Sequence, residues 1–223
     1  MLPALRHVEN WIFDLDNCLY PASCDLFALI DQRMTDFVEQ RFGLDREAAR
    51  RLQKSYFHEH GTTLSGLMAT REIDPQEFLD FVHDIDLARI SADPDLVALI
   101  DRLPGRKFVF TNGDESYARR VLDKIGFANA WDGLHDIHAM AYVPKPDPRA
   151  YRLLCDRHDI DPARALFAED MARNLKPAKV LGMVTVWVDN GSEQANADAD
   201  PDHIDFHTHD IGAWLAQATT GTS

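Results

Sequence analysis

Apolar and polar positions follow one another along this chain in two different ways. Residues 8–13 form a short run that is apolar at its end and stops at the acidic turn 14–17. This pattern is typical of a buried strand that carries carboxylates at its carboxyl end. Over residues 25–89, by contrast, apolar side chains recur at helical spacing and no strand pattern stands out. We therefore expect a long helical segment after a first strand.

Strands and helices alternate again after Pro94. We predict strands over residues 107–110, 165–168, 183–188 and near 204–206, and helices over 96–103, 115–125, 172–181 and around Trp214. The segment 189–202 is rich in Asn, Asp, Ala and Gly and is expected to be a surface loop. The alternation predicts an α/β fold with a Rossmann-like, doubly wound parallel sheet covered by helices on both faces. Its core would comprise residues 1–18 and 91–223, with residues 19–90 inserted as a helical domain.

Charge and composition indicate which binding partners and which cellular compartment to expect. The 223 residues carry 37 acidic and 23 basic side chains, a formal net charge of −14, so the protein repels polyanions and a nucleic acid polymer is not an expected partner. No apolar stretch approaches the roughly 18 residues of a membrane span, and no signal peptide pattern begins the chain. The three cysteines form neither a disulfide framework nor a CxxC pair. We expect a cytoplasmic monomer or homodimer without membrane contact.

Carboxylates follow two of the predicted strands. Asp14 and Asp16 follow the first strand, and Glu169 and Asp170 follow the strand over residues 165–168. Because the carboxyl ends of parallel strands meet at one edge of a sheet, we expect these four side chains to lie close together. Either pair alone is more simply explained as a solvated turn or a helix start. Together they form a set of oxygen ligands that suits Mg²⁺.

Groups that can bind a phosphate occur at two further places. Thr111, Asn112 and Gly113 follow the strand over residues 107–110, and Lys145 lies between two prolines that stiffen its loop. A hydroxyl, an amide, backbone N–H groups and an ammonium are the donors that hold a phosphate. With the carboxylates, they supply the nucleophile, the proton donor and the charge neutralisation that phosphoryl transfer requires. A small phosphorylated metabolite is therefore the expected partner.

The order of these groups along the whole chain resembles the four motifs of the haloacid dehalogenase superfamily. The matching residues are Phe13-Asp14-Leu15-Asp16-Asn17, Phe110-Thr111-Asn112-Gly113, Lys145-Pro146 and Glu169-Asp170. The helical insertion after the first motif resembles the cap of that superfamily, which closes over the site and contacts the leaving group. The resemblance implies a hydrolase with a Rossmann-like core and this cap.

The resemblance also implies a role for each motif residue. Asp14 would be the nucleophile, and Asp16 the general acid and base that also binds Mg²⁺ through its backbone carbonyl. Thr111 and Lys145 would hold the phosphate.

The fourth motif would complete the metal site. Asp170 would bind Mg²⁺, and Glu169 would bind it directly or through water. Haloacid dehalogenation also uses an aspartate nucleophile but no metal, so Asp16 together with the acidic pair favours a phosphatase that acts through an aspartyl-phosphate.

Shorter segments resemble the pyrimidine 5'-nucleotidase branch of the superfamily. They are residues 14–21, 56–67 and 81–86, and Asn174-Leu175. This resemblance implies hydrolysis of pyrimidine nucleoside 5'-monophosphates, with Tyr20 and Tyr56 stacking on the base. The alternatives are a phosphatase or phosphomutase for another small ester such as a sugar phosphate, and a catalytically silent relative that binds phosphometabolites.

Histidines give no clear sign of a second metal site. His83 and the other histidines of the helical segment are expected to be packed or solvated. His203, His207 and His209 have a loosely metal-like spacing, but no cysteine lies near them. Zinc is therefore not expected there.

Overall fold

The computed structural model describes residues 1–127 and 130–220. Within this part of the chain, six strands form one sheet in the order β3-β2-β1-β4-β5-β6, and all neighbouring strands are parallel. The strands are β1 (Asn10–Phe13), β2 (Arg106–Phe110), β3 (Gly133–His135), β4 (Ala165–Glu169), β5 (Val184–Val188) and β6 (Phe206–Thr208). The predicted α/β class and parallel sheet are confirmed.

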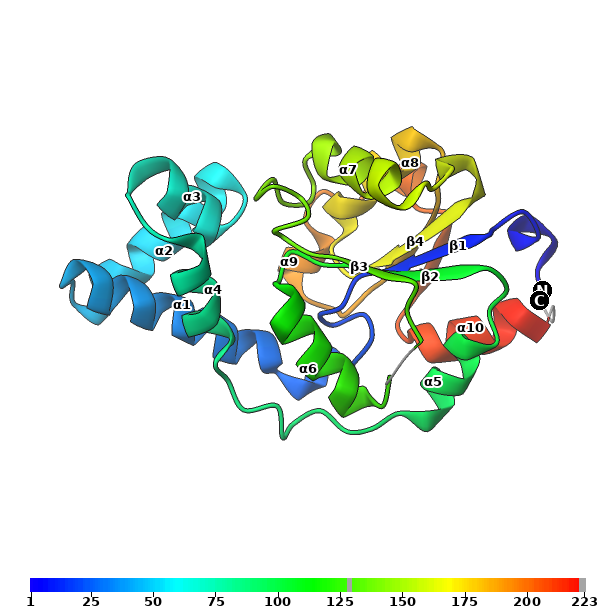
Figure 1. Cartoon of the computed structure of the whole chain (residues 1–223), viewed down its shortest axis with the longest axis horizontal. Coiled ribbons are helices and arrows are strands. Elements are labelled where there is room, and N and C mark those ends of the chain that lie inside the picture. Colours follow the sequence, from blue (N-terminus) through cyan, green and yellow to red (C-terminus); the bar gives the residue numbers. More distant parts are fainter. Residues whose placement is uncertain (128–129, 221–223) are drawn as a thin grey trace.

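Helices cover both faces of the sheet. One face carries α7 (Pro148–His158) and α8 (Leu175–Leu181), and the other carries α5 (Pro94–Asp101), α6 (Glu115–Ile125) and α10 (Ile211–Thr220) (Figure 1). Strands buried on both faces need continuous apolar runs, and Trp11, Ile12 and Phe13 of β1 are fully buried. The neighbours of β1 are β2 on one side and β4 on the other, so the strand order reverses at β1. Ligands of such sheets bind where this reversal occurs, beyond the carboxyl ends of the strands.

The segment predicted to be helical forms four helices beside the sheet (Figure 1). They are α1 (Leu26–Phe42), α2 (Arg46–His60), α3 (Thr63–Thr70) and α4 (Pro75–His83). The side chains of Asp45, Thr62 and Asp74 cap the amino ends of α2, α3 and α4. Phe37 packs edge-to-face on Phe78, which holds α1 against α4. The helical character is confirmed, whereas the domain boundaries after residues 18 and 90 remain a prediction.

Several elements differ from the sequence-based expectation. Strand β3 and helix α7 were not predicted, and the expected loop 189–202 contains the short helix α9 (Glu193–Asn196). The last strand lies at Phe206–Thr208, two residues beyond the predicted start. Strand β3 has three residues and no apolar run, so its pairing with β2, not its sequence, makes it a strand. No helix in the described residues is long and apolar enough to cross a membrane.

Candidate active site

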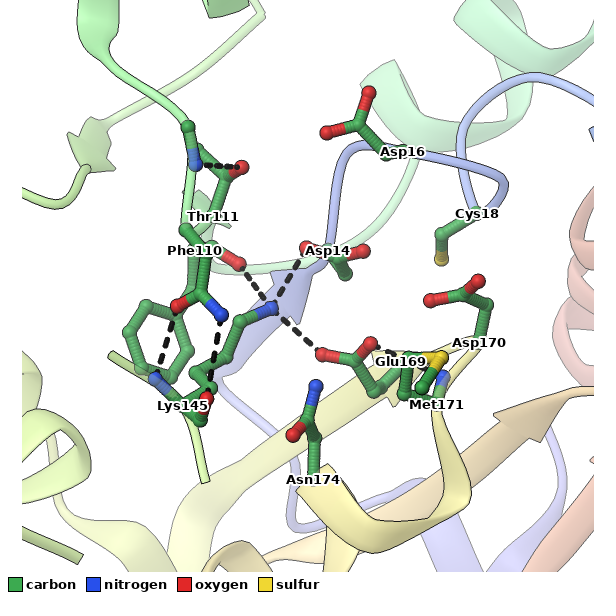
Figure 2. Close-up of polar contacts among 12 residues, drawn as sticks. Asp14, Asp16, Cys18, Phe110, Thr111, Lys145, Glu169, Asp170, Met171 and Asn174 are labelled. Atoms are coloured by element: carbon green, nitrogen blue, oxygen red, sulfur yellow. Dashed lines mark hydrogen bonds and ion pairs between the residues drawn. The ribbon is translucent and has the colours of Figure 1, made fainter. Parts of the chain in front are cut away.

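The predicted motif residues meet at the carboxyl edge of the sheet (Figure 2). Asp14 follows β1 directly, and its backbone N–H donates to Ala168 O at 2.9 Å, which continues the pairing with β4. Thr111 follows β2, and Glu169 ends β4. The loop between β3 and α7 brings Lys145 to the same place, where it is 2% exposed.

Lys145 is the centre of this cluster. Its Nζ donates to Asp14 Oδ1 at 2.7 Å, to Glu169 Oε2 at 2.6 Å and to Phe110 O at 2.9 Å. Burial lowers the pKa of Lys145, but the attraction of the two carboxylates outweighs burial and raises it above the ordinary lysine value. The ammonium therefore stays charged beside the nucleophile candidate.

Asn112 positions the lysine loop. Its Nδ2 donates to Lys145 O at 3.2 Å, and its Oδ1 accepts from Lys145 N at 2.9 Å. These two bonds use the amide oxygen and one of the two Nδ2 protons, so the second Nδ2 proton and the backbone N–H are left for a substrate, and the expected phosphate contact of Asn112 stays a prediction. Similarly, Gly113 N donates to Thr111 Oγ1 at 3.0 Å. The Thr111 hydroxyl proton remains available for an anion in the cavity that Thr111 lines.

Asp14, Glu169 and Asp170 form a buried acidic cluster. One carboxylate oxygen from each lies within 4.8 Å of the others. Burial raises the pKa of Asp14 to about 8, repulsion from Glu169 adds to the rise, and Lys145 opposes it. Burial and repulsion from Glu169 and Asp14 also raise the pKa of Asp170 well above its ordinary value.

This cluster fits a hard divalent cation. Three buried carboxylates face a single ammonium, so in their ionised form their charge is not balanced by the residues that the structure describes around them. Oxygen-only ligands at this spacing suit Mg²⁺, which would favour the ionised form of Asp14. Both oxygens of Glu169 are already engaged, one by Lys145 and one by Met171 N. Asp170 Oδ2 accepts from Asn190 Nδ2 at 2.8 Å, which orients this carboxylate.

Asp16 points away from the acidic cluster (Figure 2). Its Oδ1 accepts hydrogen bonds from Tyr20 OH at 2.6 Å and from Tyr117 OH at 2.7 Å. Its other oxygen has no hydrogen bond to any described residue, and Asp16 lines the cavity. The two tyrosines thus fix a carboxylate that can exchange a proton with a bound molecule. The expected metal contact through its backbone carbonyl stays a prediction.

The expected base-stacking role of Tyr20 and Tyr56 is corrected by the structure. Both side chains are only 4% exposed, and neither is among the described residues that line the cavity. The Tyr56 hydroxyl accepts from Thr70 Oγ1 at 2.9 Å, and its ring lies against Gly66, where an added Cβ would stand 2.4 Å from Tyr56 Cβ. Tyr56 therefore packs α2 against α3, and Tyr20 holds Asp16.

A cavity of about 540 Å³ opens above the motif residues, between the sheet edge and α1–α4. Such a volume lies within the ordinary range for small-molecule sites. The helices α1, α2 and α4 contribute apolar side chains to its wall, namely Ile30, Met34, Phe57, Phe78, Leu79 and Val82. A ligand with a phosphate on the motif residues would place its remaining part against these helices.

Sequence reasoning assigned no role to two polar residues of the cavity. Arg173 lines it with its guanidinium 5.1 Å from the centre of the Phe57 ring, and makes no hydrogen bond or ion pair with a described residue. Asn174, beside it, is 4% exposed, and its Oδ1 also has no partner in the described part of the chain. Asn174 belongs to a segment that resembles the pyrimidine 5'-nucleotidase branch, whereas the only sequence signal for Arg173 is its position three residues after Asp170.

His83 connects the helical segment to the core. Its Nδ1 pairs with Asp114 Oδ2, and its ring stacks on Tyr117 at 4.3 Å between centroids. Burial raises the pKa of Asp114, but the hydrogen bond and charge of His83 outweigh this and lower it. His83 is thus packed, as expected, and touches the tyrosine that holds Asp16.

Comparison with known proteins identifies the family. Residues 10–182 match the family described as haloacid dehalogenase-like hydrolase. Phosphate metabolism protein 8 of Saccharomyces cerevisiae is 28% identical over 189 residues, which cover 78% of this chain and 59% of the yeast protein. N-acetylmuramic acid 6-phosphate phosphatase of Pseudomonas aeruginosa is also 28% identical over 189 residues, 81% of each chain.

A solved structure shares the fold over nearly the whole length. The L-2-haloacid dehalogenase of Xanthobacter autotrophicus superimposes with a TM-score of 0.58 and 16% identity, covering 97% of this chain and 100% of the other. At this identity the match concerns the fold alone. The family match over residues 10–182 includes all four motifs. The chain therefore belongs to the haloacid dehalogenase-like hydrolase family.

Proposed function

We propose that this protein is a Mg²⁺-dependent phosphomonoesterase that acts through an aspartyl-phosphate on Asp14. The observation that carries the proposal is the buried set of Asp14, Lys145, Glu169 and Asp170 at the floor of a cavity that Thr111 also lines. The similarity to a protein named as a phosphatase of N-acetylmuramic acid 6-phosphate supports it.

The side chains would divide the reaction as follows. Asp14 attacks phosphorus while the bond to the ester oxygen breaks, and Asp16 gives its proton to that leaving oxygen. Water then attacks the aspartyl-phosphate and gives a proton back to Asp16, which releases phosphate and the Asp14 carboxylate. Lys145 and Thr111 hold the phosphoryl oxygens. Asp14, Asp170 and the backbone carbonyl of Asp16, with Glu169 directly or through water, would hold Mg²⁺, whose charge would help to neutralise the transferred group.

Two observations favour phosphoryl transfer over dehalogenation. When the three carboxylates are ionised, as attack by Asp14 requires, they carry more negative charge than Lys145 can balance, and a metal-free reaction would leave this charge uncompensated. In addition, two tyrosines hold Asp16 at the cavity wall, where a leaving oxygen needs a proton donor. A departing halide needs no such donor.

The substrates we favour are pyrimidine nucleoside 5'-monophosphates, with another small ester such as a sugar phosphate as the alternative. The cavity of about 540 Å³ has room for a nucleoside beyond the phosphate. With Tyr20 and Tyr56 buried elsewhere, Phe57 and Arg173 are the better candidates to contact the base.

The direct test is a phosphate-release screen over nucleotides and sugar phosphates, with and without chelator. We expect release only with Mg²⁺, loss of activity in excess chelator, and recovery when Mg²⁺ is restored, because the buried carboxylates otherwise repel the phosphate. Full activity in excess chelator would overturn the metal assignment. Halide release from 2-haloacids without phosphate release would establish the dehalogenase instead.

Arg173 provides a test of leaving-group contact. We expect Arg173→Met to lower kcat/KM for nucleoside monophosphates by roughly 10- to 100-fold, the range of a lost hydrogen bond to a charged group. The small ester p-nitrophenyl phosphate should lose much less. Arg50→Met is the matched control, because Arg50 also lines the cavity but already pairs with Asp31 at 3.5 Å. Equal losses on both substrates in Arg173→Met would assign Arg173 to the phosphate or to packing.

A further inference from the structure

A second group of possible metal ligands lies outside the cavity, at the edge of the sheet. Asp189 follows β5 directly, His207 lies in β6, and His209 follows β6. Residues two apart on an extended strand project to the same face, so the two imidazoles can face one partner. The backbone N–H of Asp189 donates to Thr208 O at 2.7 Å, which sets Asp189 beside both histidines.

The separations of the ligand atoms are close to those around a tetrahedral metal. Asp189 Oδ2 lies 3.2 Å from His207 Nε2 and 3.7 Å from His209 Nδ1, and all three ligand atoms lie within 4.8 Å of one another. Around zinc, with bonds of about 2.0–2.1 Å, tetrahedral ligand atoms are about 3.3–3.4 Å apart. Small side-chain rotations would bring the three atoms to one ion, with His209 Nδ1 giving up its proton and its present hydrogen bond to Asp189 O at 3.0 Å.

Contacts with neighbouring residues already orient Asp189 and His207. Gly191 N donates to Asp189 Oδ1 at 2.8 Å, which leaves Oδ2 toward the histidines. The His207 ring stacks on the indole of Trp187 at 4.8 Å between centroids. Such contacts hold metal ligands in place in known sites. The His209 side chain is 73% exposed, so water can reach a fourth coordination position.

The structure does not bring together the three histidines whose spacing is loosely metal-like. His203 pairs with Asp200 at 3.2 Å rather than joining His207 and His209. Asp189, eighteen residues before His207, takes its place. The spacing along the chain could not indicate this, because the pairing of β5 with β6 brings Asp189 near.

We propose that Asp189, His207 and His209 form a binding site for a transition metal ion of the Zn²⁺ class, separate from the acidic cluster. Two imidazoles and one carboxylate favour such ions over Mg²⁺, which prefers oxygen ligands alone.

The neighbours of this proposed site also contact the acidic cluster. Trp187 Nε1 donates to Asp170 O at 2.9 Å, and Asn190 Nδ2 donates to Asp170 Oδ2 at 2.8 Å. Occupancy would therefore change the surroundings of Trp187 and of Asp170.

Zinc titration of the purified protein against a chromophoric chelator, in excess Mg²⁺, tests this site without measuring activity. We expect the wild type to hold one equivalent of Zn²⁺ more than His207→Ala or His209→Ala, with a change in tryptophan fluorescence that both variants lack. His203→Ala is the matched control and should behave like the wild type. His207 and His209 are 47% and 73% exposed, so their replacement should leave the fold intact by circular dichroism. Equal zinc binding by the wild type and both variants would overturn the proposal.

Discussion

Replacing Asp14 by asparagine is expected to abolish turnover, with a loss on the order of 10⁵-fold or more, as for other enzymes that lose their nucleophile. The amide is nearly isosteric but cannot attack phosphorus. Its oxygen can still accept from Lys145 Nζ, which also keeps its bonds to Glu169 and Phe110 O. Because burial and Glu169 disfavour the charged form of Asp14, its neutral replacement should not lower stability appreciably.

Phosphate release and thermal unfolding, measured on the same preparations, separate the two effects. The expected result is a folded protein with a melting temperature near or above that of the wild type and no measurable turnover. Activity within tenfold of the wild type would exclude Asp14 as the nucleophile.

Replacing Asp16 by asparagine should have a different signature. The nucleophile remains, but the general acid and base is lost, which costs roughly 10²- to 10⁴-fold in rate. Tyr20 and Tyr117 can still donate to the amide oxygen, so the local structure should persist. With p-nitrophenyl phosphate, whose leaving group needs little protonation, phosphorylation should survive better than dephosphorylation, and phosphoprotein should accumulate.

Pre-steady-state kinetics of Asp16→Asn would show whether dephosphorylation is slowed more than phosphorylation. A burst of p-nitrophenol followed by slow turnover is the expected result. Tyr117→Phe is a useful control, because it keeps the carboxylate and removes only one of its two hydrogen bonds. It should lose much less activity than Asp16→Asn. A uniform loss on all esters with no burst would contradict the assigned role.

The sheet and the grouping of the motif residues were accessible from sequence because they depend on simple rules. Strands β1 and β4 are buried and therefore read as apolar runs, and parallel strands carry their following residues to one edge. Asp14, Thr111 and Glu169 each follow or end such a strand, so their proximity could be predicted. The position of Lys145 beside Asp14 could be predicted only from the motif resemblance, because nothing in the sequence of its loop indicates where that loop folds.

Other features depend on tertiary packing that local sequence does not encode. Aromatic residues of the helical segment can face either the cavity or a neighbouring helix. Tyr56 faces a neighbouring helix, because its side chain packs against Gly66 of α3. Tyr117 lies one helical turn beyond the second motif, and its bond to Asp16 spans 101 positions of the chain. Arg173 was not noticed because its place in the cavity wall depends on Phe57 of α2.

The central claim is that the phosphoryl group passes to Asp14, and trapping that intermediate tests it most directly. Asp16→Asn would be mixed with p-nitrophenyl phosphate and Mg²⁺, quenched rapidly in acid, digested and examined by mass spectrometry. The account predicts one added phosphoryl group on the peptide that contains Asp14, and no label when Asp14→Asn is combined with Asp16→Asn. Label on any other residue, or undiminished labelling without Asp14, would contradict it.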